Sequence, residues 1–256
     1  MSERKGFTLI ELLVVIAIIA LLMSILMPAL NRAKDQAKNA VCMSNLHQFA
    51  IAWKIYLDDN RNIFPKENGD WVWALFDYYR NPALLICPSA TKLKVPVIDE
   101  EVRGGPRNAW GDKKGDEVLI ASYGTNEFCS RDQSDIRTWD RLYVNATTSQ
   151  AYRTPLMSDC SRDGDAPMEY DIPPEYDGQI YMSVPSDKNE MRSFCFNRHN
   201  FHINMIFLDW SVRSVGLKEL WILKWHREWS MSPETMPTEW DDPAHWMSNL
   251  PDPYAL

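Results

Sequence analysis

The first sixty residues carry two hydrophobic patterns, one after the other. Within residues 7–27 the only strongly polar side chain is Glu11. This apolar run of about 21 residues predicts a helix of roughly 31 Å, which matches the hydrocarbon core of a membrane. The run is too long for the apolar part of a cleaved secretory signal, and no small-x-small cleavage site follows it. We therefore expect a membrane-spanning helix.

The second pattern is an amphipathic stripe that continues the same helix. Apolar residues recur at positions i, i+3, i+4, i+7 and i+11, namely Leu46, Phe49, Ala50, Trp53 and Leu57. The opposite face carries charged side chains, namely Arg32, Lys34, Asp35, Lys38 and Lys54. We predict one helix from Phe7 to about Leu57, with its first half in lipid and its second half packed on a folded domain.

Later segments predict a small sheet. Prolines and glycines divide the chain after Asn60 into short segments, as in a loop-rich domain. Residues 203–208 and 212–215 predict two strands joined at Asp209-Trp210, and residues 152–159 predict a further strand or buried segment. We expect an α+β fold in which an antiparallel sheet of about four strands lies against the outer half of the helix.

Charge bears on topology and on partners. Arg4 and Lys5 precede the apolar run, which predicts a cytoplasmic N-terminus and an exported remainder; the basic residues beyond the run weaken this argument. The net charge of −8 argues against nucleic acid as a partner. The 11 tryptophans and 10 tyrosines favour a core or a subunit contact over carbohydrate binding.

The start of the chain resembles a known processing motif. The sequence KGFTLIE, from Lys5 to Glu11, followed by LLVVIAII, resembles the cleavage and methylation motif of type IV pilins and type II secretion pseudopilins. The resemblance implies that a membrane-embedded peptidase cuts after Gly6 and that the new N-terminal residue, Phe7, is N-methylated. It also implies that Glu11 is the glutamate which this family keeps at that position.

The implied cut gives Glu11 a physical role. It creates an ammonium group at Phe7, one helical turn from Glu11. In a filament, Glu11 of one subunit can pair with the Phe7 ammonium of its neighbour, and a wrong register would leave a buried charge alone at a cost of roughly 3–5 kcal/mol. We predict that Glu11 sets the register of assembly. The alternative is a carboxylate that merely reaches to the membrane interface.

Two small features of the same segment support this interpretation. Gly6 has no Cβ, so a protease cleft can approach its backbone closely. Pro28 follows the apolar run, and a proline inside a helix removes one hydrogen bond and kinks it. Pilin-like proteins commonly carry a proline in this region, so we expect a bend or local melting near Pro28.

Further segments resemble a branch of large pseudopilin-like proteins of the planctomycete type. They are CMSNLHQFAIAWKIYLDDNRNIFP at 42–65, LICPS at 85–89, SYGTN at 122–126, and Arg198-His199-Asn200 followed by Asp209. The related proteins usually have Asp-Gly at the predicted hairpin turn, where φ is positive. Here Trp210 replaces the glycine, which would cost roughly 1–2 kcal/mol. Either the turn differs, or packing holds the tryptophan.

The chain has five cysteines, all outside the cytoplasm in the predicted topology. An oxidising compartment favours disulfides, and an odd number leaves one thiol over. We predict a disulfide between Cys42 and Cys87, which would tie the helix to a loop, and with less support one between Cys160 and Cys195. The alternative is buried thiols. Because there is no C-x-x-C pair, the sequence does not indicate a zinc site or a thioredoxin-like centre.

Calcium is the one cofactor that the sequence suggests. Asp159, Asp163 and Asp165 alternate around Gly164 as in the first half of a calcium loop, but Tyr170 stands where a bidentate glutamate belongs. Major pseudopilins of the resembled family bind calcium in a carboxylate-rich loop. The alternative is an ordinary Asp/Gly turn.

No catalytic residue is indicated. His199, His202 and Asp209 are expected to diverge across strand faces, with His199 bonding backbone near the hairpin. No serine or cysteine lies in a recognisable nucleophile motif.

The leading hypothesis is a non-enzymatic structural subunit of a type IV pilus-like or type II secretion pseudopilus filament. We expect a leader (1–6), a membrane and polymerisation helix (7–28), its amphipathic continuation (29–60) and an exported domain (61–256). The protein would cross the bacterial inner membrane once, with its C-terminal domain in the periplasm. Its partners would be a prepilin peptidase/methylase and other pilin-like subunits. The alternative is a membrane-anchored binding module whose Trp-rich tail grips a glycan or other envelope ligand.

Overall fold

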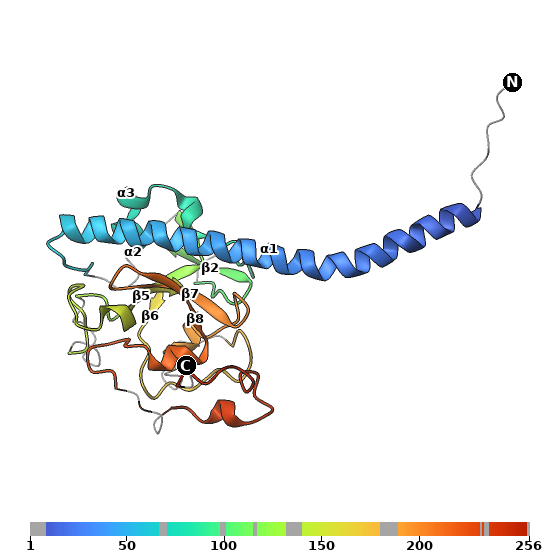
Figure 1. Cartoon of the computed structure of the whole chain (residues 1–256). Coiled ribbons are helices and arrows are strands. Elements are labelled where there is room, and N and C mark those ends of the chain that lie inside the picture. Colours follow the sequence, from blue (N-terminus) through green and yellow to red (C-terminus); the bar gives the residue numbers. More distant parts are fainter. Residues whose placement is uncertain are drawn as a thin grey trace. The chain divides into compact units, whose positions relative to one another are not determined.

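The long helix runs through both compact units of the molecule. The computed structural model describes residues 9–66, 71–97, 101–114, 117–131, 140–179, 189–230, 232 and 236–254. Helix α1 spans Leu9–Asp59 (Figure 1), and the chain divides into the units Met1–Lys38 and Asn39–Leu256. The predicted continuous helix is confirmed over these residues, and its expected start at Phe7 lies outside them.

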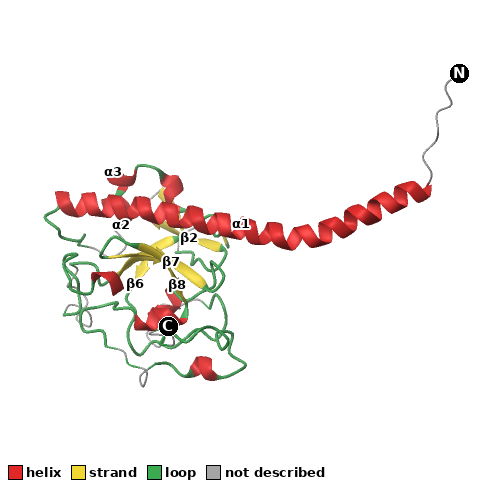
Figure 2. Ribbon diagram, in the orientation of Figure 1, coloured by secondary structure: helices red, strands yellow, loops and turns green. Residues whose placement is uncertain are grey.

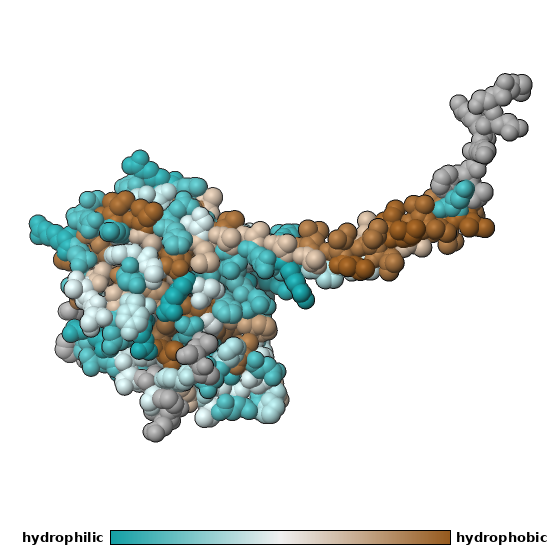
Figure 3. Space-filling model, viewed as in Figure 1, coloured by the Kyte–Doolittle hydropathy of each residue, from teal (hydrophilic) through white to brown (hydrophobic). Residues whose placement is uncertain are grey.

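The first unit is an exposed apolar helix. The large apolar side chains from Leu9 to Leu30 are 44–79% exposed, and Figure 3 shows them as a brown surface. By length and composition, α1 is a candidate membrane span. The helix stays continuous through Pro28, so the structure shows no local melting there, and the expected bend stays a prediction. So large an apolar surface requires lipid or other helices around it.

The second unit contains two sheets (Figure 2). The larger has the order β6-β4-β5-β7-β8, formed by Tyr123–Asn126 (β4), Pro155–Asp159 (β5), Gly164–Asp165 (β6), His202–Phe207 (β7) and Val212–Gly216 (β8). All its pairs are antiparallel except β4–β6. The smaller sheet has the order β1-β2-β3, formed by Lys92–Leu93, Asn108–Lys114 and Glu117–Ala121. The prediction of about four antiparallel strands is confirmed by β4, β5, β7 and β8. It did not include the parallel strand β6 or the smaller sheet.

Short helical turns lie between α1 and the first strand, between some of the strands, and after β8. Two are α-helical, namely Trp71–Ala74 (α2) and Phe76–Tyr79 (α3). The others are 3-10 turns, namely Pro82–Leu85 (η1), Ala151–Arg153 (η2), Glu190–Ser193 (η3), Lys218–Ile222 (η4) and Glu239–Asp241 (η6). The η2 turn explains why β5 begins at Pro155, three residues later than the predicted segment.

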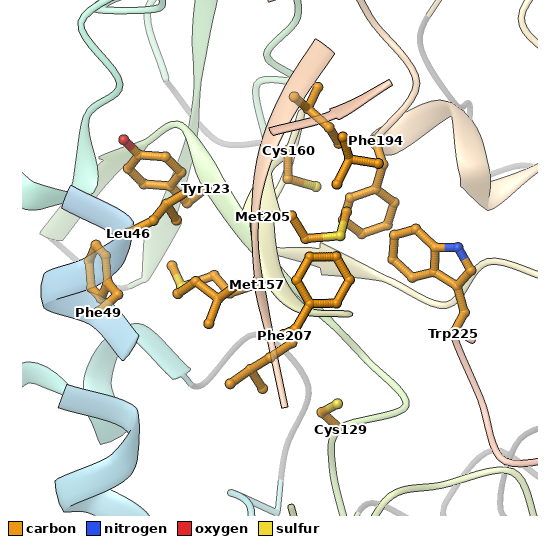
Figure 4. Packing of buried hydrophobic residues seen from close by; sticks show 14 of the residues in the cluster. Leu46, Phe49, Tyr123, Cys129, Met157, Cys160, Phe194, Met205, Phe207 and Trp225 are labelled. Carbon is orange, nitrogen blue, oxygen red and sulfur yellow. The ribbon is translucent and has the colours of Figure 1, made fainter. Parts of the chain in front are cut away.

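The amphipathic stripe of α1 packs on the larger sheet. All five predicted stripe residues are buried, which confirms that prediction. The ring of Phe49 lies 6.1 Å from that of Tyr123 on β4 and 5.2 Å from that of Tyr79. Figure 4 shows Leu46 and Phe49 of α1 facing the sheet, with Phe194 and Trp225 on its other side. Burial of each large apolar side chain stabilises the fold by about 1.5–3 kcal/mol.

The turn of the β7–β8 hairpin places Trp210 in a strained backbone conformation. Trp210 has a φ of 70°, in the left-handed region that a glycine would occupy without strain. Its side chain is half-buried and packs against the core, while Asp209 accepts hydrogen bonds from the backbone and hydroxyl of Ser211. The turn differs from the expected type I′ turn, because Phe207 pairs with Ser211 around three residues and Trp210, but not Asp209, has a positive φ. The packing of Trp210 against the core accompanies this conformation.

Gly124 of β4 can test how closely this strand packs against residues 160–163. A Cβ there would lie 2.4 Å from the carbonyl oxygen of Arg162, whereas a Cβ at Gly105 would meet nothing within 4 Å. We expect Gly124→Ala to lower the free energy of unfolding by about 1–3 kcal/mol. The control Gly105→Ala should change it by less than about 0.5 kcal/mol. Denaturant unfolding of the full chain in detergent measures both, and equal stabilities would contradict the packing described.

Candidate functional site

Four side chains that can ligate a metal meet inside the second unit. Cys42 lies on α1, Cys87 follows η1, Asp159 ends β5 and His199 precedes β7. The sulfur, carboxylate and ring-nitrogen atoms of these residues all lie within 4.8 Å of one another. All four residues are buried. We call them the cysteine–histidine cluster.

Asp159 is held by a fully buried guanidinium. Its Oδ1 accepts a hydrogen bond from Nη1 of Arg198 at 3.0 Å, and its Oδ2 accepts one from the backbone N–H of Asn204 at 2.9 Å. Arg198 also donates to the carbonyls of Ser122 and Gly105, each at 2.6 Å. Burial raises the pKa of Asp159, but the charge of Arg198 and the contact with His199 outweigh it and lower the pKa to about 2. Asp159 is therefore ionised at neutral pH.

Cys87 and His199 form a second charged pair in the cluster. The Sγ of Cys87 lies 3.5 Å from Nε2 of His199, and this nitrogen lies 3.3 Å from Oδ2 of Asp159. Burial raises the pKa of Cys87, but hydrogen bonds from Cys42 and His199 lower it to about 6. Burial lowers the pKa of His199, but hydrogen bonds to Asp159 and Cys87 raise it to about 9. At neutral pH the pair is a thiolate and an imidazolium.

Cys42 completes the cluster as a neutral thiol. Its Sγ lies 3.7 Å from Oδ1 of Asp159 and accepts a hydrogen bond from the hydroxyl of Tyr123 at 3.4 Å. Burial, the hydrogen bond to Cys87 and the charge of Asp159 all raise the pKa of Cys42. The thiolate and the carboxylate are therefore balanced by the imidazolium of His199 and the guanidinium of Arg198.

The structure tests the predicted roles of the histidines, but it leaves the predicted disulfides untested. All five cysteines are buried free thiols. Cys42 and Cys87 are neighbours, so their disulfide stays a prediction, as does the one between Cys160 and Cys195. His199 is predicted to bond backbone near the hairpin. Its own N–H donates to the carbonyl of His202, but its side chain faces Asp159 and Cys87, contacts that the sequence did not predict. His202 and Asp209 diverge from it as expected, each bonding a near neighbour in sequence.

The predicted calcium ligands have different partners. Asp159 belongs to the cysteine–histidine cluster, whereas Asp163 and Asp165 both face Arg162, at 3.3 and 3.6 Å. Asp165 also accepts a hydrogen bond from the hydroxyl of Ser193 at 2.5 Å. This arrangement gives no support to calcium at these three carboxylates, which stays a prediction.

Of the predicted assembly and processing residues, only Glu11 lies within the described part of the first unit. Glu11 is in the first turn of α1, within its exposed apolar half. Gly6 and Phe7 lie outside the described residues. The first unit therefore carries the predicted assembly site, and the second carries the cysteine–histidine cluster.

The ion pair of Asp159 and Arg198 has a measurable consequence. Asp159→Asn leaves the buried guanidinium without its counter-charge, so we expect it to lower the free energy of unfolding by about 3–5 kcal/mol. The control Asp163→Asn disturbs a partly exposed ion pair and should cost about 0–1 kcal/mol. Chemical denaturation of the full chain in detergent compares the two, and similar losses in both variants would refute the assignment.

Comparison with known proteins identifies the N-terminal motif. Residues 1–27 match the family model for the prokaryotic N-terminal methylation motif. Over 62 residues the chain is 44% identical to the type IV wide pilus major component PilA4 of Thermus thermophilus, which covers 24% of this chain and 47% of that relative. The chain thus spans about half the length of that relative. No solved structure matches the chain.

A second relative matches a longer part of the chain. Over 152 residues the chain is 28% identical to the type II secretion system core protein G of Klebsiella michiganensis, which covers 58% of this chain and 97% of that relative. The planctomycete-type branch stays a prediction. The methylation motif, these two relatives and the α+β fold with its long apolar helix make the chain similar to type IV pilins and type II secretion pseudopilins.

Proposed function

We propose that this protein is a structural subunit of a type IV pilus-like or type II secretion pseudopilus filament. The observation that carries the proposal is the division of α1, whose first half is apolar and exposed while its later part is buried in a folded domain. The names of the two relatives, a pilus major component and a secretion core protein, support it. The protein does mechanical work and no chemistry of its own.

Processing prepares the subunit for assembly. A prepilin peptidase/methylase cuts after Gly6 and methylates Phe7, which the match of residues 1–27 to the methylation motif supports. The new ammonium group then pairs with Glu11 of an adjacent pilin-like subunit. Inside an apolar bundle this pair is weakly screened, so a shift of one subunit along its neighbour is costly.

The apolar half of α1 has two alternative surroundings. The apolar helix fits a membrane-anchored protein, and we place it across the inner membrane with a cytoplasmic N-terminus and residues 61–256 exported. Lipid tails are as apolar as leucine, so in the membrane helices associate through packing and polar pairs. In a filament outside the bilayer, neighbouring helices replace lipid, and burial of each large side chain contributes about 1.5–3 kcal/mol.

The tryptophans of the tail favour this proposal over a glycan-binding module. Trp229 and Trp240 are buried, and the ring of Trp240 lies 5.1 Å from that of Trp221. Trp246 is half-buried and donates its ring N–H to the carbonyl of Pro174 at 2.7 Å. In the described part of the tail these three rings pack in or against the core of the domain, and two of them offer almost no surface to a sugar.

Glu11→Val tests the proposed pairing between subunits. We expect the variant to be cleaved and methylated normally but to be lost from filaments, because its carboxylate acts between copies. The control Ser24→Val changes another polar residue of the same helix without changing charge, and should assemble. Recovery of each protein with sheared filaments and with other pilin-like subunits measures incorporation. Wild-type incorporation of the Glu11→Val protein would defeat the proposal.

A further inference from the structure

The cysteine–histidine cluster has the composition of a metal site. Two sulfur atoms, one imidazole nitrogen and one carboxylate oxygen form a donor set that suits zinc, and structural zinc sites are almost always four-coordinate and tetrahedral. We propose that Cys42, Cys87, Asp159 and His199 bind one divalent metal ion of the zinc type, which fastens helix α1 to the larger sheet and to two loops. This inference is independent of the proposed filament function.

The spacing of the donor atoms matches a tetrahedron around one ion. Zinc bonds of about 2.3 Å to sulfur and about 2.0–2.2 Å to nitrogen and oxygen place neighbouring ligand atoms about 3.3–3.8 Å apart. The separation is 3.5 Å between Sγ of Cys87 and Nε2 of His199, and 3.3 Å between that nitrogen and Oδ2 of Asp159. It is 3.8 Å between Sγ of Cys42 and the same Oδ2 of Asp159, and all four donor atoms lie within 4.8 Å of one another. These side chains need little movement to become ligands.

The surroundings of the cluster hold the ligands in place. Arg198 and the backbone N–H of Asn204 orient the carboxylate of Asp159, and the hydroxyl of Tyr123 contacts the sulfur of Cys42. Such outer partners fix the geometry of metal ligands in proteins. Arg198 is a cation beside the site, but its charge offsets the negative charge of a complex with two thiolates and one carboxylate. It therefore does not oppose metal binding.

The balance of charge also suits a divalent ion. Two thiolates and one carboxylate carry three negative charges, which a divalent ion and the neighbouring guanidinium of Arg198 offset. The ligated site is therefore neutral, and a metal ion leaves no uncompensated charge in the core.

A disulfide between Cys42 and Cys87 is the rival use of the same thiols. An oxidant would remove two electrons and two protons, one of them from the charged pair of Cys87 and His199. Arg198 would keep Asp159 as its counter-charge, but His199 would lose its thiolate partner. A disulfide would also use only two of the four convergent side chains. The presence of His199 and Asp159 at the same point therefore favours the metal.

The proposed ion would act at a mechanically important place. Cys42 lies three residues after Asn39, where the second compact unit begins. Its ligands are distant in sequence, since 117 residues separate Cys42 from Asp159 and 112 separate Cys87 from His199. An ion that joins such distant segments couples its binding free energy to folding. It would hold the helix near Cys42, the first buried residue of α1 in the second unit.

Metal analysis of the full chain tests the proposal directly. We expect protein isolated from membranes in detergent to contain one zinc ion per chain. After removal of the metal by a chelator under reducing conditions, cobalt(II) should give the visible bands of a tetrahedral thiolate site, saturating at one ion per chain. Zinc(II) should then bleach these bands.

Matched variants assign the ligands. Cys87→Ser and His199→Gln should each weaken cobalt binding by at least tenfold and alter its spectrum. The control Cys129→Ser removes a buried thiol outside the cluster and should bind like the wild type.

Two results would overturn the proposal, and both come from the wild-type chain, so neither depends on whether a variant folds. The first is the absence of tetrahedral thiolate bands in the reduced chain with cobalt(II). The second is a Cys42–Cys87 disulfide, found by non-reducing peptide mapping of protein alkylated during extraction.

Discussion

One helix has to satisfy two different environments, and this constraint organises the whole molecule. Along residues 9–30 the large apolar side chains of α1 are exposed, so that half is stable only among lipid or other helices. From Cys42 to Leu57 the same helix buries one stripe against a sheet. The first requirement explains the absence of a polar face near the N-terminus. The second explains why the charged face appears only beyond the apolar run.

The interior of the second unit solves a different problem, which is the burial of charge. Arg198 and Asp159 have no exposed side-chain surface, and burial of two such ions is costly unless their hydrogen bonds are well placed. The guanidinium meets this condition through Asp159 and two backbone carbonyls. Asp159 links this ion pair to the cysteine–histidine cluster, because its carboxylate also faces His199 and Cys42. A core that only needed to be stable would carry apolar residues here, so the cluster calls for a specific role.

The sequence predicts well those features that depend on neighbours along the chain. The length of α1, its buried stripe and the β7–β8 hairpin follow from local periodicity and turn composition, and all three are confirmed in the described residues. Trp210 shows the limit of such reasoning, because its positive φ depends on packing against the core. The two-residue strands β1 and β6 were missed because they are short and pair with segments that are not adjacent in sequence. The local β2–β3 hairpin was missed because its end carries Asp112, Lys113 and Lys114, which are residue types depleted in strands.

The cluster could not be predicted from spacing, because its members converge only in the folded domain. Cys42, Cys87 and His199 do lie in three of the four segments that resemble related proteins, and Asp159 ends a predicted strand. This shared resemblance is the one signal that could have grouped them. The calcium pattern is the opposite case, because it is regular in sequence but its residues have different partners in the fold. Asp159, Asp163 and Asp165 are regularly spaced, but Asp159 is the last residue of β5, and its carboxylate faces a different cation from the other two.

The mass of the native N-terminus tests the central claim most directly. If the protein is a filament subunit of this family, the chain isolated from its own membranes or filaments begins at Phe7 and carries one N-methyl group. A mature chain that keeps residues 1–6 could not form an ammonium group at Phe7. That result would contradict assembly through Glu11 and with it the proposed function.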